Sequence, residues 1–140
     1  MPTKKKRPTR RASAGQPTEA ELEILEVLWE IGPCALGQIH EALADKRSGG
    51  YTTTQKMVQV MGEKGLVVKD DSVRPHLYRS AEPRERTQFK LLDYVRERAF
   101  GGSAKELILS AVSGRNLTKE ELAEIKRQIN AAQRQEGAES

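Results

Sequence analysis

The amino-acid sequence predicts a mainly α-helical protein with one small β-hairpin, in two folded parts. Apolar residues recur at helical spacing in three segments between residues 18 and 65. Two short apolar runs then flank a polar turn, and only helical patterns follow from residue 84. A chain of 140 residues has room for one domain of ordinary size, or for one small domain with an appendage.

The first helix is predicted to begin at the capping box Thr18-Glu19-Ala20-Glu21, in which hydroxyl and carboxylate satisfy free backbone donors. Leu22, Leu25 and Trp29 follow at helical spacing, so we expect Trp29 to lie in the core. Gly32-Pro33 ends this helix. A short second helix is marked by three apolar residues and stops before Ser48-Gly49-Gly50: Leu36, Ile39 and Leu43.

A third helix is predicted from about Thr52 to Lys64, with Gly65 as its C-terminal stop. Its apolar positions are Met57, Val58 and Met61. Two short apolar runs, 66–69 and 75–78, then surround a polar turn at 70–72 and predict a β-hairpin.

Three helices followed by a hairpin is the order of a winged helix-turn-helix, in which the third helix enters the major groove. Gln55 could pair with adenine, Lys56 and Lys64 suit phosphate or guanine, and Thr53 can contact a thymine methyl group. Arg74 and His76 would lie along the backbone as the wing, and Tyr51 could abut a phosphate or simply cover the apolar cluster. The predicted DNA-binding residues of this part are Tyr51, Thr52, Thr53, Gln55, Lys56, Gln59, Lys64, Arg74 and His76.

The positive charge of the chain is concentrated at its start. Residues 1–17 hold six basic side chains and no acidic one, and we predict that they form a disordered arm that adds DNA affinity. The remaining residues hold 18 basic and 20 acidic side chains, and residues 51–80 carry only +2. The basic residues of the arm are Lys4, Lys5, Lys6, Arg7, Arg10 and Arg11.

The helices after residue 84 carry more apolar surface than so short a segment can hide, which predicts pairing with a second copy. The predicted dimer-interface residues are Leu91, Leu92, Val95, Leu107, Ile108, Val112, Leu122, Ile125 and Ile129. A twofold dimer would place two recognition helices on half-sites about one turn (~34 Å) apart. We therefore divide the chain into the arm (1–17), the winged helix-turn-helix (18–81), a helical dimerisation part (82–135) and a disordered tail (136–140).

Several classes of protein are excluded. The single cysteine, Cys34, rules out a disulfide framework and a multi-cysteine metal site. No apolar run approaches the roughly 20 residues of a membrane span, and no secretory signal follows the basic start, so we expect a soluble, cytoplasmic protein. The hydrolase, zinc-protease and dinucleotide motifs do not occur, and His40 and His76 are the only histidines. We expect no enzymatic activity, cofactor or bound metal.

Five strings, taken in order and spacing, resemble the penicillinase-repressor (BlaI/MecI/CopY) family; they are Thr18–Trp29, Gly32-Pro33, Tyr51–Thr54, Glu63–Val67 and His76–Tyr78. The resemblance covers roughly residues 18–134. It implies a bacterial winged-helix repressor that dimerises through its C-terminal part and sits on inverted repeats, controlling genes such as those for β-lactamase or copper handling. It also implies recognition contacts at Thr53, Gln55, Lys56 and Gln59.

The sequence departs from that family in three features. Relatives often have Arg where this chain has Val60, so the operator sequence is not carried over. Members that respond to β-lactams are cut at an Asn-Phe bond, which is absent here, where the corresponding stretch is 108–112; the clustered cysteines of the copper branch are also absent. A regulatory protease with a different target bond is therefore a candidate partner. The alternative function is a protein-interaction module with a winged-helix fold, which the acidic first two helices would suit.

Overall fold

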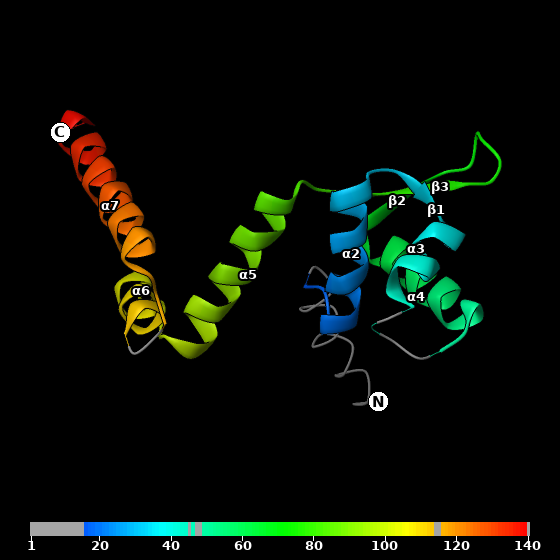
Figure 1. Cartoon of the computed structure of the whole chain (residues 1–140), viewed down its shortest axis with the longest axis horizontal. Coiled ribbons are helices and arrows are strands. Elements are labelled where there is room, and N and C mark those ends of the chain that lie inside the picture. The colour runs from blue at the N-terminus through cyan, green and yellow to red at the C-terminus, as the bar shows by residue number, and fades with distance from the viewer. Residues whose placement is uncertain (1–15, 45, 47–48, 114–115, 140) are drawn as a thin grey trace, which may run out of the picture. The chain divides into compact units, whose positions relative to one another are not determined.

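The structure is a computed structural model that describes residues 16–44, 46, 49–113 and 116–139 (Figure 1). The predictions for the basic arm fall on residues outside this range, apart from Gln16 and Pro17. The chain forms two compact units that divide between Asp93 and Tyr94.

The three predicted helices of the first unit are confirmed as α2 (Glu19–Ile31), α3 (Leu36–Leu43) and α4 (Tyr51–Lys64). The capping box of α2 is complete. Thr18 N donates to Glu21 Oε1 at 2.9 Å, and Glu21 N donates to Thr18 Oγ1 at 3.1 Å. Gly65, with φ of 83°, ends α4 in the left-handed conformation that glycine adopts without strain.

The predicted hairpin is confirmed as β2 (Val67–Asp70) and β3 (Leu77–Ser80), which pair antiparallel. The structure adds a third strand that we did not predict, β1 (Cys34–Ala35), so the sheet has the order β1-β3-β2. β1 connects α2 to α3, and its pairing with β3 fixes the wing to the start of α3.

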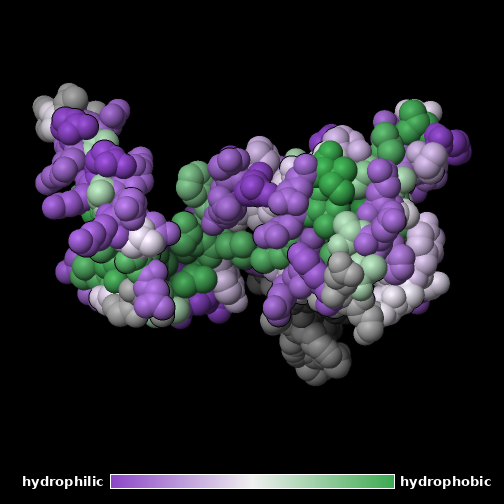
Figure 2. Space-filling model, in the orientation of Figure 1, coloured by the Kyte–Doolittle hydropathy of each residue, from purple (hydrophilic) through white to green (hydrophobic). Residues whose placement is uncertain are grey.

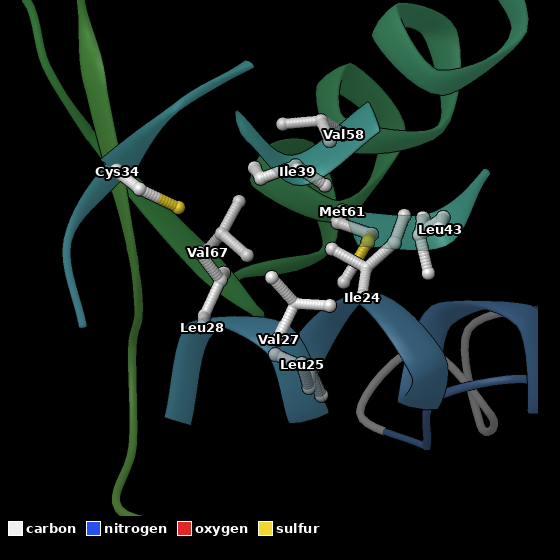
Figure 3. Close-up of a cluster of buried hydrophobic side chains, with 10 residues drawn as sticks. All are labelled: Ile24, Leu25, Val27, Leu28, Cys34, Ile39, Leu43, Val58, Met61 and Val67. Atoms are coloured by element: carbon white, nitrogen blue, oxygen red, sulfur yellow. The ribbon is translucent and has the colours of Figure 1, made fainter. Parts of the chain in front are cut away.

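One hydrophobic core holds the first unit together, and Figure 3 shows side chains from all three helices and two strands meeting in it. Trp29 packs against this core in a partly buried position, whereas Cys34 is only 1% exposed. The fully or nearly fully buried apolar side chains are Ile24, Leu25, Val27, Leu28, Cys34, Ile39, Leu43, Val58, Met61 and Val67.

The C-terminal helices are α5 (Arg84–Ala99), α6 (Ala104–Val112) and α7 (Lys119–Glu139). The predicted break between the first two is confirmed at Gly101 and Gly102, both with positive φ. α7 continues to Glu139, so the tail expected after Gln135 lies in a helix instead, as an extension of the long α7. The compact units divide inside α5, between Asp93 and Tyr94.

Apolar side chains remain uncovered on these helices. Among the described residues from Tyr94 to Gly137, none is buried. Figure 2 shows apolar residues gathered on the surface along α5 and over α6. Of the predicted interface residues, Leu92, Val95, Ile108, Leu122 and Ile129 are each more than 40% exposed, and Leu91, Leu107, Val112 and Ile125 are partly buried.

Candidate nucleic-acid interface

Helix α4 has a buried side and a polar side. Thr54, Val58 and Met61 face the core, and Met57 packs against it. The residues on the other side are exposed to solvent: Tyr51, Thr52, Thr53, Gln55, Lys56 and Gln59. The core thus holds the helix by one stripe and leaves hydroxyl, amide and ammonium groups free to face a partner.

The first turn of α4 is held by His40 of α3. His40 Nδ1 lies 2.9 Å from Thr54 Oγ1, and the imidazole meets the ring of Tyr51 edge-on, with centroids 5.7 Å apart. Thr54 is buried, so this hydrogen bond satisfies a hydroxyl that water does not reach. The N-cap is Gly50, which has no side chain to cap the helix.

The last turn of α4 is held by an ion pair that the sequence did not reveal. Lys64 Nζ donates to both carboxylate oxygens of Glu21, at 3.0 and 2.9 Å, and the Glu21 side chain is nearly buried. The sequence predicts Lys64 as a contact to phosphate or guanine. Because its ammonium group is engaged with Glu21, we assign it to the scaffold and leave it out of the proposed interface.

The hairpin turn is organised by its own polar groups. Asp70 Oδ1 accepts from Ser72 Oγ at 2.6 Å and from Ser72 N at 3.0 Å, and these hydrogen bonds lower the pKa of the Asp70 carboxyl. Arg74 Nη1 donates to the carbonyl oxygens of Asp71 and Val73 at 2.8 and 3.2 Å. The turn therefore carries two carboxylates, and the guanidinium group is hydrogen-bonded to the backbone of the same turn.

A groove of about 830 Å³ brings together residues from α3, α4 and the wing. Predicted contact residues from two elements share it: Tyr51 and Gln55 of α4 with Arg74 and His76 of the wing. A second groove, of about 350 Å³, is lined by Gln55, Gln59 and Lys69, among others. Gln55 lines both grooves.

The structure points to one further residue on the same face. Val60 is 43% exposed, one turn beyond Lys56, although it is apolar. The sequence carries a signal for this position, since Val60 lies outside the apolar stripe of Met57, Val58 and Met61. An exposed methyl surface there suits the methyl group of thymine.

Other kinds of site find no support in the part of the chain that the structure describes. Among those residues, no group of three or more His, Cys, Asp or Glu side chains could hold a metal ion. In the same residues, no helix is long and apolar enough to cross a membrane.

Comparison with known proteins gives one family. No curated protein matches the chain. The family model described as penicillinase repressor matches residues 17–131, which include most of both compact units. The chain therefore belongs to the penicillinase-repressor family, whose members are transcriptional regulators.

Proposed function

We propose that this protein is a dimeric, sequence-specific DNA-binding repressor that acts on an inverted-repeat operator. The observation that carries the proposal is the exposed polar side of α4, placed beside the wing and anchored from behind by the core. A helix held in this way can enter a major groove without losing side-chain contacts of its own fold.

The exposed side chains of α4 are of two kinds: uncharged groups that can contact bases, and the ammonium group of Lys56. Gln55 presents an amide that can pair with both N6 and N7 of adenine, and Thr53 can contact a thymine methyl group. Lys56 suits guanine or a phosphate. Gln59 follows Gln55 by one turn and extends the reading surface along the groove.

Phosphate contacts come from the start of this helix and from the wing beside it. Tyr51 begins α4, where the positive end of the helix dipole and the first backbone N–H groups suit a phosphate oxygen. Arg74 and His76 line a groove with Tyr51 and can therefore reach phosphates of the same DNA strand. Asp70 and Asp71 repel phosphates, so the wing approaches the backbone with Arg74 and His76 and not with its turn.

The basic arm, residues 1–17, adds affinity that does not depend on sequence. It precedes Thr18, whose capping partner Glu21 also holds Lys64 at the end of α4. The arm is therefore attached beside the C-terminal end of the recognition helix. Its six basic side chains can follow phosphates or a minor groove from that point: Lys4, Lys5, Lys6, Arg7, Arg10 and Arg11.

A second copy of the chain completes the C-terminal unit. From Tyr94 to Gly137 no described side chain is buried, and a helix as short as α6 is marginal in water unless its apolar face is covered. Residues such as Val95, Ile108 and Ile129 offer that face. Twofold symmetry would present two copies of α4 to the two half-sites of an inverted repeat.

The test is selection of duplexes bound by the full chain from a random pool, followed by sequencing. The proposal expects one inverted repeat to be enriched, with affinity falling as salt rises at a slope of about 0.9 per phosphate neutralised. Equal affinity for scrambled duplexes would contradict it and would favour a protein-interaction module. A regulatory protease could relieve repression by cutting the chain. It would have to cut a bond other than Asn-Phe, which the chain lacks, and the exposed stretch Ile108–Leu109 is a candidate.

A further inference from the structure

Trp29 ties the end of α2 to the segment that leaves the sheet. Its Nε1–H donates to Ser80 Oγ at 2.9 Å and to the carbonyl oxygen of Glu82 at 3.1 Å. These partners lie more than fifty residues away along the chain. Because the indole nitrogen only donates, its partly buried position requires such acceptors.

The segment between β3 and α5 is also held by hydrogen bonds between its own residues. Ser80 Oγ donates to the Glu82 carbonyl oxygen at 2.5 Å and accepts from Glu82 N at 3.3 Å. Ala81 N donates to the carbonyl oxygen of Leu66 at 2.9 Å. The three residues that lead into α5 therefore have a defined path.

The first turns of α5 are held at this place too. The Arg84 guanidinium lies 5.5 Å from the centre of the Trp29 ring, a cation–π contact. Lys90 Nζ donates to Glu82 Oε2 at 2.7 Å. Thr87 is only 6% exposed, and this stretch of α5 belongs to the same compact unit as α2.

We propose that Trp29 is a positioning residue for operator recognition. Its hydrogen bonds to Ser80 and Glu82, with its contact to Arg84, fix the direction in which α5 leaves the winged-helix part. That direction sets the spacing of half-sites that the dimer accepts. The inference rests on the proposed function, since it needs two recognition helices joined through the C-terminal helices.

The geometry of DNA makes this direction matter. One inserted base pair rotates a half-site by about 34° relative to the other and moves it by about 3.4 Å. A connection that keeps its contacts to Trp29 and to the Leu66 carbonyl oxygen resists such a change. A connection that has lost its Trp29 hydrogen bonds can follow it more readily.

The experiment compares full-length variants on the selected operator and on versions with one base pair added or removed between the half-sites. Trp29→Phe keeps a ring but loses the N–H donor, and Ser80→Ala removes the hydroxyl that links both neighbours. Both variants should lose about tenfold of the discrimination between spacings. Their affinity for a duplex with a single half-site should change by less than about twofold, whereas a merely structural role would lower both affinities alike. Ser80→Thr keeps the hydroxyl and should behave as the unaltered protein.

A measurement without DNA accompanies this comparison. The chain has one tryptophan, so the NMR spectrum contains one indole N–H signal, and its exchange with solvent can be followed. Slow exchange is expected in the unaltered protein and in Ser80→Thr, and faster exchange in Ser80→Ala. Exchange as fast as in free indole would overturn the proposal.

The outcomes separate the two claims. If the unaltered protein prefers no duplex at all, the proposed function falls and this inference falls with it. If an inverted repeat is preferred but Trp29→Phe and Ser80→Ala keep full discrimination between spacings, only the role of Trp29 is overturned. Should Trp29→Phe fail to fold in a melting control, Ser80→Ala with its matched Ser80→Thr decides the question.

Discussion

Lys64 and Glu21 form a bidentate ion pair that joins the last turn of α4 to the first turn of α2. The same Glu21 carboxylate accepts from the backbone N–H of Thr18, so one nearly buried group closes a capping box and anchors the recognition helix. The pair shows how a lysine at the edge of a predicted DNA-binding helix can belong to the scaffold.

Lys64→Ala should lower the free energy of unfolding by about 2 kcal/mol, because it leaves the Glu21 carboxylate buried without its cation. The expected cost is below that of a fully buried pair since the Lys64 side chain is 25% exposed. Urea unfolding measures it. Lys56→Ala, on the exposed side of the same helix, is the matched control and should stay within about 0.5 kcal/mol of the unaltered protein. Equal stability of the two variants would show that the ion pair contributes nothing.

Gln55 and Lys56 should differ in what they contribute to DNA binding. Gln55→Ala should cost about 1–3 kcal/mol on the preferred operator and relax the choice of base at one position in each half-site. Lys56→Ala, if Lys56 contacts phosphate, should weaken binding to all duplexes and reduce the salt slope by about 1. Titrations on operator and scrambled duplexes at several salt concentrations separate these effects. A Gln55→Ala protein with unchanged base preference would remove Gln55 from the reading surface.

The basic arm should act on all duplexes alike. Removal of residues 1–15 leaves the capping box at Thr18 intact, so the fold should keep its stability. Affinity for operator and scrambled DNA should fall by similar factors, and the salt slope should become shallower. If the shortened protein binds as tightly as the whole chain at low salt, the arm has no part in DNA binding.

Cys34 should make the protein sensitive to alkaline pH. Burial in the core raises the pKa of its thiol, because the thiolate would lose its hydration. Since the pKa is higher in the folded state than in the unfolded state, the stabilising contribution is complete below the unfolded pKa and is lost as the pH rises through the folded value. Cys34→Ala should remove this part of the alkaline loss in unfolding measurements. An identical pH dependence in both proteins would contradict the assignment.

The local signals of the sequence predicted most of the first unit. The capping box at Thr18, the glycine at position 65 and the helical stripes act within a few residues, so they can be recognised without the fold. β1 could not be predicted in this way. Cys34 and Ala35 are too short a run to show periodicity, and they become a strand only because Tyr78 and Leu77 lie opposite.

The site was predictable to a similar degree and for a similar reason. The exposed residues of α4 follow from its helical period, which separates Gln55 and Gln59 from Val58 and Met61. The position of Lys64 could not be predicted, because its partner Glu21 lies 43 residues away. The hydrogen bonds of Trp29 to Ser80 and Glu82 join residues more than fifty positions apart, so they could not be predicted from the sequence either.

Pairing of two copies through the C-terminal helices is the central claim, and sedimentation velocity tests it most directly. The unaltered chain should sediment as a dimer at micromolar concentration and load two chains onto one inverted-repeat duplex. Ile108→Lys places a charge on the uncovered face of α6 and should give a monomer, whereas Ile31→Lys, at an equally exposed isoleucine of α2, should remain a dimer. A monomeric unaltered chain that binds the duplex one copy at a time would contradict the account.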